Sequence, residues 1–135
     1  MATLGHEVGV TTGRKRRCGW FDAELIRFAV ELNGLSELIV TKLDVLDSFK
    51  TIKICTGYTY NGKKVGYIDG DANFLAKVKP VYREMKGWEQ KTTGVKKFAD
   101  LPKEAKIYIE TIEKLVGVRV SYISNGAKRD EIIRR

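Results

Sequence analysis

The sequence predicts an α/β domain in which short strands alternate with helices. Two segments carry apolar residues at the helical period, and each is followed by a short run rich in β-branched residues. A third segment alternates β-branched or aromatic residues with polar or small ones and ends in Asn-Gly, the strongest short hairpin signal. At 135 residues the chain is long enough for one compact domain with a sizeable core, and it shows neither an internal repeat nor a low-complexity linker.

The first helix is predicted over residues 22–34. Asp22 can cap its amino end, an apolar stripe follows one face, and Asn33-Gly34 ends it in the manner of a left-handed cap. The next run, residues 37–41, is apolar and β-branched, which predicts a buried strand.

A hairpin is predicted over residues 51–68, with Asn61-Gly62 as its turn. The segment from Gly57 to Lys64 comes close to the phosphate-binding pattern GxxxxGK[ST]. It lacks the metal-binding hydroxyl and lies between two strands rather than between a strand and a helix. We therefore interpret it as a hairpin only.

The second half of the chain repeats the helix–strand order. Residues 81–88 fit a strand or an irregular edge, and residues 91–100 a loop. A second helix opens at Leu101-Pro102 and ends at Gly117. Residues 118–123 then form the second buried-strand candidate, followed by a tight turn at residues 124–126.

Composition narrows the range of partners. The net charge of +8 and the pI near 9.5 favour anionic ligands but do not separate a nucleotide from a nucleic acid. No apolar run approaches the roughly 20 residues that span a bilayer, and no signal-peptide pattern opens the sequence, so we expect a cytoplasmic protein with no membrane partner. Cys18, Cys55 and His6 are too few for a structural zinc site, and nothing supports a Cys–His catalytic pair.

The most informative stretch is the basic loop, residues 9–17. Guanidinium groups match carboxylate and phosphate oxygens in pairs, threonine hydroxyls add hydrogen bonds, and Gly13 lets the backbone approach a ligand. A small, multiply negative ligand is one interpretation. A basic run is also typical of a nucleic-acid patch or a nuclear-import signal, so a basic nucleic-acid-binding module is the alternative. Aromatic residues do not interleave with the cations, which argues against that alternative.

A second constellation, Thr41-Lys42-Leu43-Asp44, follows the first strand candidate. One carboxylate can accept both adjacent donors of guanine, N1–H and the exocyclic amino group, whereas adenine offers no such pair. The stem of Lys42 could lie across the base, and the turn at residues 124–126, at a neighbouring strand end, could contact the same ring. Alternatively Asp44 caps the following turn or pairs with a lysine, and the second motif is only a turn.

Together these motifs resemble adenylosuccinate synthetase, specifically its C-terminal part. The resemblance covers essentially the whole chain and implies one C-terminal segment of a P-loop-NTPase-like fold, with a mixed or parallel sheet, flanking helices and a β-hairpin. It is carried by Val10–Asp22, which contains TTGRKRRCGW, by Thr41–Asp47, which contains TKLD, and by Asn33-Gly34, Ile52-Lys53, Pro80–Tyr82, Gly87-Trp88, Asp100–Pro102, Tyr108-Ile109, Glu113 and Val116–Val118.

The resemblance implies a ligase of AMP biosynthesis that joins IMP and L-aspartate with GTP hydrolysis. GTP phosphorylates the inosine 6-oxygen, and the aspartate amine then displaces phosphate. The basic loop would hold L-aspartate and IMP, and the other motifs would hold GTP, with Arg16 shared. The implied L-aspartate and IMP residues are Val10, Thr11, Thr12, Gly13, Arg14, Lys15 and Arg16, and the implied GTP residues are Arg16, Lys42, Leu43, Asp44, Ser124, Asn125 and Gly126.

The family's glycine-rich phosphate loop, catalytic aspartate and histidine, and Mg²⁺ ligands belong to an N-terminal part that this sequence lacks. We therefore expect no catalytic or metal-binding residue in this chain, and no turnover by the chain alone, because phosphoryl transfer needs metal and positioned phosphates. The resemblance further implies a homodimer. We also expect the basic loop and the TKLD motif to face a common cleft.

Overall fold

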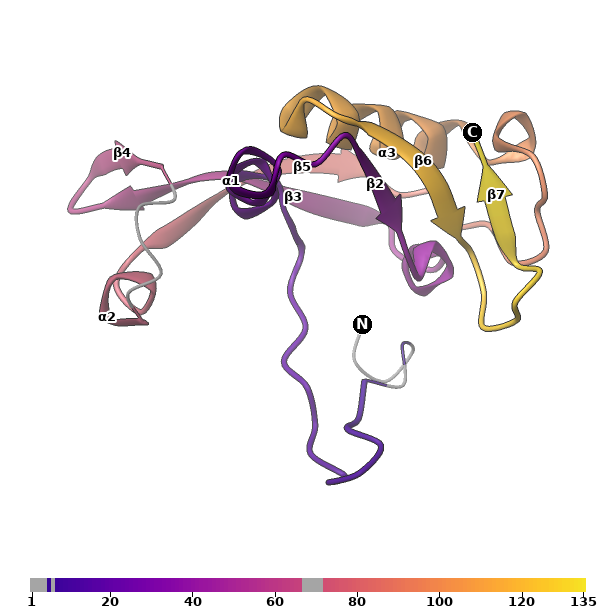
Figure 1. Ribbon diagram of the computed structural model, residues 1–135, viewed down its shortest axis with the longest axis horizontal. Helices are drawn as coiled ribbons and strands as arrows, with labels where there is room; N and C mark the ends of the chain where they lie inside the picture. The colour runs from indigo at the N-terminus through magenta and orange to yellow at the C-terminus, as the bar shows by residue number, and fades with distance from the viewer. Residues whose placement is uncertain (1–4, 6, 67–71) are drawn as a thin grey trace.

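Two small sheets and two long helices make up the part of the chain that the computed structural model describes, namely residues 5, 7–66 and 72–135. The first sheet and its hairpin extend to one side, while the second sheet and the longer helix occupy the other (Figure 1). The segment before the first helix leaves this body as a long loop (Figure 1). The predicted α/β class is confirmed.

Helix α1, Ala23–Asn33, begins and ends at the predicted residues. The Asp22 side chain accepts a hydrogen bond from the Leu25 backbone N–H at 3.0 Å, which satisfies one free amide of the first turn. Gly34 closes the helix at φ 63°, a conformation that glycine adopts without a Cβ penalty.

The first sheet is built around the ten-residue strand β3, Thr51–Tyr60. Strand β1, Phe21–Asp22, pairs with it in parallel, and β4, Lys63–Val65, and β5, Lys79–Lys86, pair with it antiparallel. Asn61 and Gly62 both have positive φ, 48° and 77°, as the predicted hairpin turn requires. The near-match to a phosphate loop is therefore a hairpin, as expected.

The second sheet has the order β2-β6-β7 and places two predicted motifs side by side. Strands β2, Glu37–Val40, and β6, Arg119–Ser124, are parallel, with Val40 opposite Ile123. Strand β7, Ile132–Arg134, pairs antiparallel with β6. The carboxyl ends of parallel neighbours share one sheet edge, so the segments that follow β2 and β6 lie together.

Helix α3, Lys103–Val116, connects the two sheets through one core. It follows Pro102 and ends at Gly117, whose φ is 81°. Its buried face joins residues of both sheets in a single apolar cluster, which includes Ile52 and Ile54 of β3, Ile109 and Ile112 of α3, Val120 and Ile123 of β6, and Ile133 of β7.

Several expectations need correction. The run 37–41 was expected to form a buried strand, but β2 lies at a sheet edge with alternating exposure, and Ile39 is 61% exposed. Residues 81–88 do form a strand, which begins earlier, at Lys79. Five short elements were not predicted, namely β1, β7, α2 (Ala72–Leu75) and the 3-10 turns η1 (Leu43–Leu46) and η2 (Phe98–Asp100). His6 and the end of the predicted return strand, residues 67–68, lie outside the described residues.

Candidate functional site

The basic loop is a tight hairpin held by its own backbone. The Gly9 N–H donates to the Arg14 carbonyl at 2.9 Å, and the Gly13 N–H donates back to the Gly9 carbonyl at 2.8 Å. Val8 and Lys15 form an isolated antiparallel bridge. Gly13 has φ 64°, a conformation that glycine adopts without a Cβ penalty. Residues 10–18 are all exposed, which leaves the tip of the hairpin open to a ligand.

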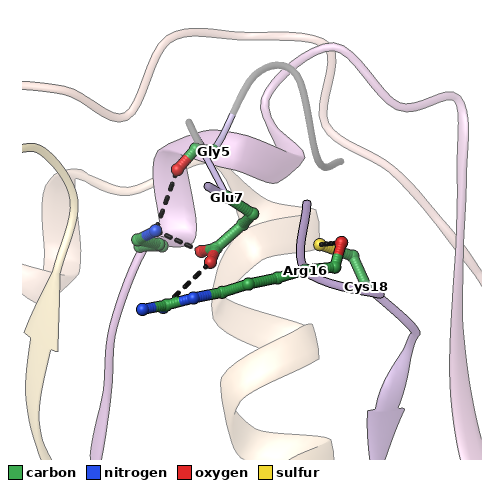
Figure 2. Close-up of polar contacts among 5 residues, drawn as sticks. Gly5, Glu7, Arg16 and Cys18 are labelled. Atoms are coloured by element: carbon green, nitrogen blue, oxygen red, sulfur yellow. Dashed lines mark hydrogen bonds and ion pairs between the residues drawn. The ribbon is translucent and has the colours of Figure 1, made fainter. Parts of the chain in front are cut away.

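Glu7 ties the basic loop to the TKLD motif. Its carboxylate accepts hydrogen bonds from Arg16 Nη1 at 3.3 Å and from Lys42 Nζ (Figure 2). Lys42 Nζ also donates to the Gly5 carbonyl at 2.9 Å, and the Arg16 N–H donates to the Glu7 carbonyl at 3.0 Å. Glu7 and Lys42, which are 35 positions apart in the sequence, are therefore in direct contact.

The charge of Glu7 is matched to these two cations. The hydrogen bond from Lys42, together with the nearby Arg16 guanidinium, holds the pKa of Glu7 below its usual range. The side chain of Glu7 is 20% exposed, whereas Arg16 and Lys42 remain 63% and 51% exposed. Both cations therefore keep much of their side-chain surface in contact with solvent.

The TKLD motif forms the turn after β2. Lys42 has φ 60°, and its carbonyl accepts the Val45 N–H at 3.2 Å, which starts η1. Leu43 is 1% exposed and anchors the turn in the core, while Asp44 is half-buried. Any ligand contact from Leu43 would therefore come from its backbone, whereas the Asp44 side chain is partly open to solvent.

The Ser124–Gly126 turn lies beside this motif, because β2 and β6 are parallel neighbours. Ser124 Oγ donates to the Gly126 carbonyl at 3.1 Å and stabilises the turn. The Asn125 side chain is fully buried and donates to the carbonyls of Thr92 and Val95, so a ligand contact from Asn125 would use its backbone.

A cleft of about 280 Å³ opens where the amino-terminal segment meets the TKLD turn. No residue of the basic loop, 9–17, lines this cleft, and neither do Asp44 and the 124–126 turn, so the expected common cleft is not formed. The basic loop and the TKLD motif are instead linked through Glu7. The lining of the cleft includes Glu7, Cys18 and Trp20 from the amino-terminal segment, Thr41 and Lys42 from the motif, and Tyr108 from α3.

Among residues 5, 7–66 and 72–135, no three His, Cys, Asp or Glu side chains gather as metal ligands would. None of the helices described is long and apolar enough to cross a membrane.

Two groups that shape the site escaped sequence reasoning. Glu7 is the only acidic residue before Asp22, and its place beside four cations was a usable signal. Asp47 accepts three hydrogen bonds in the structure, from Trp88 Nε1, Thr92 N–H and Thr92 Oγ1, yet its sequence neighbourhood carries no sign of this.

Comparison with known proteins identifies the family. The family model for adenylosuccinate synthetase matches residues 1–133. An adenylosuccinate synthetase from Herminiimonas arsenicoxydans is 50% identical over 133 residues, and one from Geobacter metallireducens is 50% identical over 129. These matches cover 98% and 96% of this chain but only 31% and 30% of the relatives.

A solved structure agrees with the sequence match. The fully ligated adenylosuccinate synthetase from Plasmodium falciparum superposes with a TM-score of 0.94 at 31% identity, covering 98% of this chain and 32% of that one. The chain thus spans about a third of the length of the proteins it matches. With a family model that covers nearly every residue and a fold that superposes throughout, the chain belongs to the adenylosuccinate synthetase family.

Proposed function

We propose that this chain is the substrate-holding part of an adenylosuccinate synthetase, which ligates IMP and L-aspartate with GTP hydrolysis. In this proposal the basic loop binds L-aspartate and the IMP side, and the TKLD and Ser124–Gly126 turns bind guanine. That the segment is the carboxyl-terminal part of the enzyme stays a prediction. So do a cytoplasmic location, a homodimer, and the use of Mg²⁺ held by residues outside this chain.

The observation that carries the proposal is the position of Glu7 between Arg16 and Lys42. A carboxylate fits between the basic loop and the TKLD motif, and both cations stay half-exposed or more. L-aspartate carries carboxylates, and GTP ends in phosphate oxygens, both of which a guanidinium can bind in pairs. Arg16 is therefore placed to exchange Glu7 for a substrate anion, next to the turn proposed to hold guanine.

The proposed chemistry assigns binding and orientation to this chain. Arg14 and Arg16 would hold the aspartate carboxylates so that its amine faces C6 of the purine. That amine attacks C6 and forms the new C–N bond. The C6–O bond breaks, the phosphorylated 6-oxygen leaves as part of inorganic phosphate, and the amine nitrogen loses a proton. Holding the two reactants together removes much of the entropic barrier of a bimolecular step. Phosphoryl transfer itself needs groups outside this chain, so we expect the chain alone to show no turnover.

The assembled enzyme, meaning this chain combined with the rest of the synthetase, tests the binding roles. We expect adenylosuccinate formation that depends on GTP, IMP and L-aspartate. Arg14→Ala and Arg16→Ala should each lower kcat/KM for L-aspartate at least tenfold, since a charge-assisted hydrogen bond contributes ~1.5–3 kcal/mol. Arg17→Ala is the neighbouring control. Lys63→Ala and Lys64→Ala, in the hairpin at the far end of the molecule (Figure 1), should be silent.

Equal losses from Arg14→Ala, Arg17→Ala and Lys63→Ala would contradict a specific aspartate loop and would favour general charge attraction instead. If the chain is instead a nucleic-acid-binding module, its affinity for single-stranded oligonucleotides should fall steeply with salt concentration and should not depend on base identity. Preference for GDP over ADP at constant salt is expected only from the guanine site.

Base reading is tested separately at Asp44. Replacing it with Asn removes an acceptor from the pair that faces N1–H and the amino group of guanine, and an amide can instead donate to the 2-oxo group of xanthine. Asp44→Asn in the assembled enzyme should lower the preference for GTP over XTP by ~1–3 kcal/mol, measured as the ratio of kcat/KM values. An unchanged ratio would remove Asp44 from the guanine site.

A further inference from the structure

A chain of hydrogen bonds joins the two proposed guanine-side turns through a third segment. The Asp47 N–H donates to the Asp44 carbonyl at 3.1 Å. The Asp47 carboxylate accepts the Thr92 N–H and Thr92 Oγ1, each at 2.8 Å. The Thr92 carbonyl in turn accepts Asn125 Nδ2 at 2.5 Å. The path thus runs from Asp44 to the Ser124–Gly126 turn without using any proposed ligand contact.

The side-chain donors in this path belong to buried residues, whereas Asp44 and Asp47 are half-buried. Thr92 and Asn125 are both 0% exposed, and Trp88, which donates Nε1 to Asp47 at 2.8 Å, is 3% exposed. Hydrogen bonds to an ionised carboxylate are short and strong, and a buried donor left unpaired carries a full desolvation cost. Breaking one of these bonds would leave a buried donor unpaired, so the path favours one position for its two ends, although Asn125 Oδ1 itself has no hydrogen-bond partner among the described residues.

We propose that Thr92 is a positioning residue for guanine selection, and that Asp47, Thr92 and Asn125 hold the two turns at a fixed spacing. This inference rests on the proposed role of Asp44 in reading guanine. A two-point hydrogen bond to the base tolerates only ~0.5 Å of displacement, so the carboxylate must be held as well as present. The pairing of β2 with β6 ends at Val40 and Ile123. The hydrogen-bond path through Asp47, Thr92 and Asn125, here called the brace, holds the two turns together beyond that point.

Thr92→Val tests the brace, because valine keeps the size of threonine and removes only the hydroxyl that donates to Asp47. In the assembled enzyme, the preference for GTP over XTP should fall about fivefold or more, while KM for L-aspartate stays within about twofold. Thr92→Ser keeps the hydroxyl and should restore the preference. Thr93→Val, the same change at the exposed neighbouring residue, is the matched control and should leave both values unchanged.

Asn125→Ala cuts the opposite end of the path and serves as the second variant if Thr92→Val does not fold, as judged by circular dichroism. It should lower the same preference. In the double variant the two losses should not add, since both interrupt one path.

The outcomes separate the brace from base reading. A changed GTP:XTP ratio in Asp44→Asn, with no change in folded Thr92→Val or Asn125→Ala, would overturn the brace and leave the guanine role of Asp44 intact. No change in Asp44→Asn would remove both. Equal increases in KM for GTP, XTP and L-aspartate in Thr92→Val would show a general structural role and would also overturn the positioning role.

Discussion

At the scale of single residues, Glu7 connects the basic loop to the TKLD motif, the two segments proposed to bind substrates. Four cations in a row repel one another and would favour an extended, solvated loop. A carboxylate between Arg16 and Lys42 offsets that repulsion on the side that faces the body of the protein. Because Arg16 and Lys42 are 63% and 51% exposed, solvent screens the contact, as the proposed exchange of Glu7 for a substrate anion requires.

The titration of Glu7 is a direct test of this contact. Its folded-state pKa lies below the ordinary value of 4.5, chiefly because Lys42 donates to it. The contact therefore contributes stability above the ordinary pKa and loses it as the pH falls through the lower, folded-state value. Carboxyl-carbon NMR of Glu7 should give a midpoint below 4.5, and Lys42→Ala should move that midpoint upward.

Arg17→Ala is the control for this titration. Arg17 carries the same charge as Lys42 but is not among the groups that lower the pKa of Glu7. A midpoint that responds equally to Lys42→Ala and Arg17→Ala would mean that net charge, and not the contact, sets the titration.

At the scale of elements, the sequence predicted those features that a residue and its immediate neighbours determine. Asp22, Gly34 and Gly117 mark helix ends through their own side chains or φ angles, and each end was located from sequence. Strands β1 and β7 have two and three residues, and their conformation comes from pairing with β3 and β6, which no local pattern records. The exposure of Ile39 was missed for a related reason: an apolar run predicts a strand but not what packs against it.

The same limit applies to the site. The TTGR and TKLD segments carry their chemistry in the residue types themselves, so both could be proposed as binding segments from the sequence. The buried position of Asn125 depends on Thr92 and Val95, some thirty residues away, and could not be anticipated from the turn alone.

Gly87 provides the test at this scale, because it ends β5 where the chain passes close to another backbone. A Cβ there would lie 1.7 Å from the Phe49 carbonyl oxygen, and the Gly87 N–H donates to the Lys50 carbonyl at 2.8 Å. Gly87→Ala must displace backbone and should lower the free energy of unfolding by ~1–3 kcal/mol in urea titrations. Gly19→Ala, which meets no atom within 4 Å, should change it by less than about 0.5 kcal/mol. Equal effects of both changes would contradict the close approach.

At the scale of the whole molecule, helix α3 makes one body out of two sheets. Its buried residues pack with Ile54 of the first sheet and with Val120, Ile123 and Ile133 of the second, in one continuous cluster. The turns proposed to bind guanine and the loop proposed to bind L-aspartate are attached to this shared core. Their relative position is therefore only as stable as the packing of α3.

Ile109 is the residue through which this dependence can be measured, since it is 0% exposed in the middle of α3. Ile109→Ala leaves a cavity in the cluster and should lower the free energy of unfolding by ~2–5 kcal/mol, a large part of the ~5–15 kcal/mol that stabilises a typical domain. Ile107→Ala, on the same helix but 41% exposed, should cost about 1 kcal/mol or less. Because both sheets share the core, circular dichroism and tryptophan fluorescence should agree with each other on the urea midpoint within each variant. Two separated transitions in Ile109→Ala would show that the sheets are stabilised independently and that α3 does not couple them.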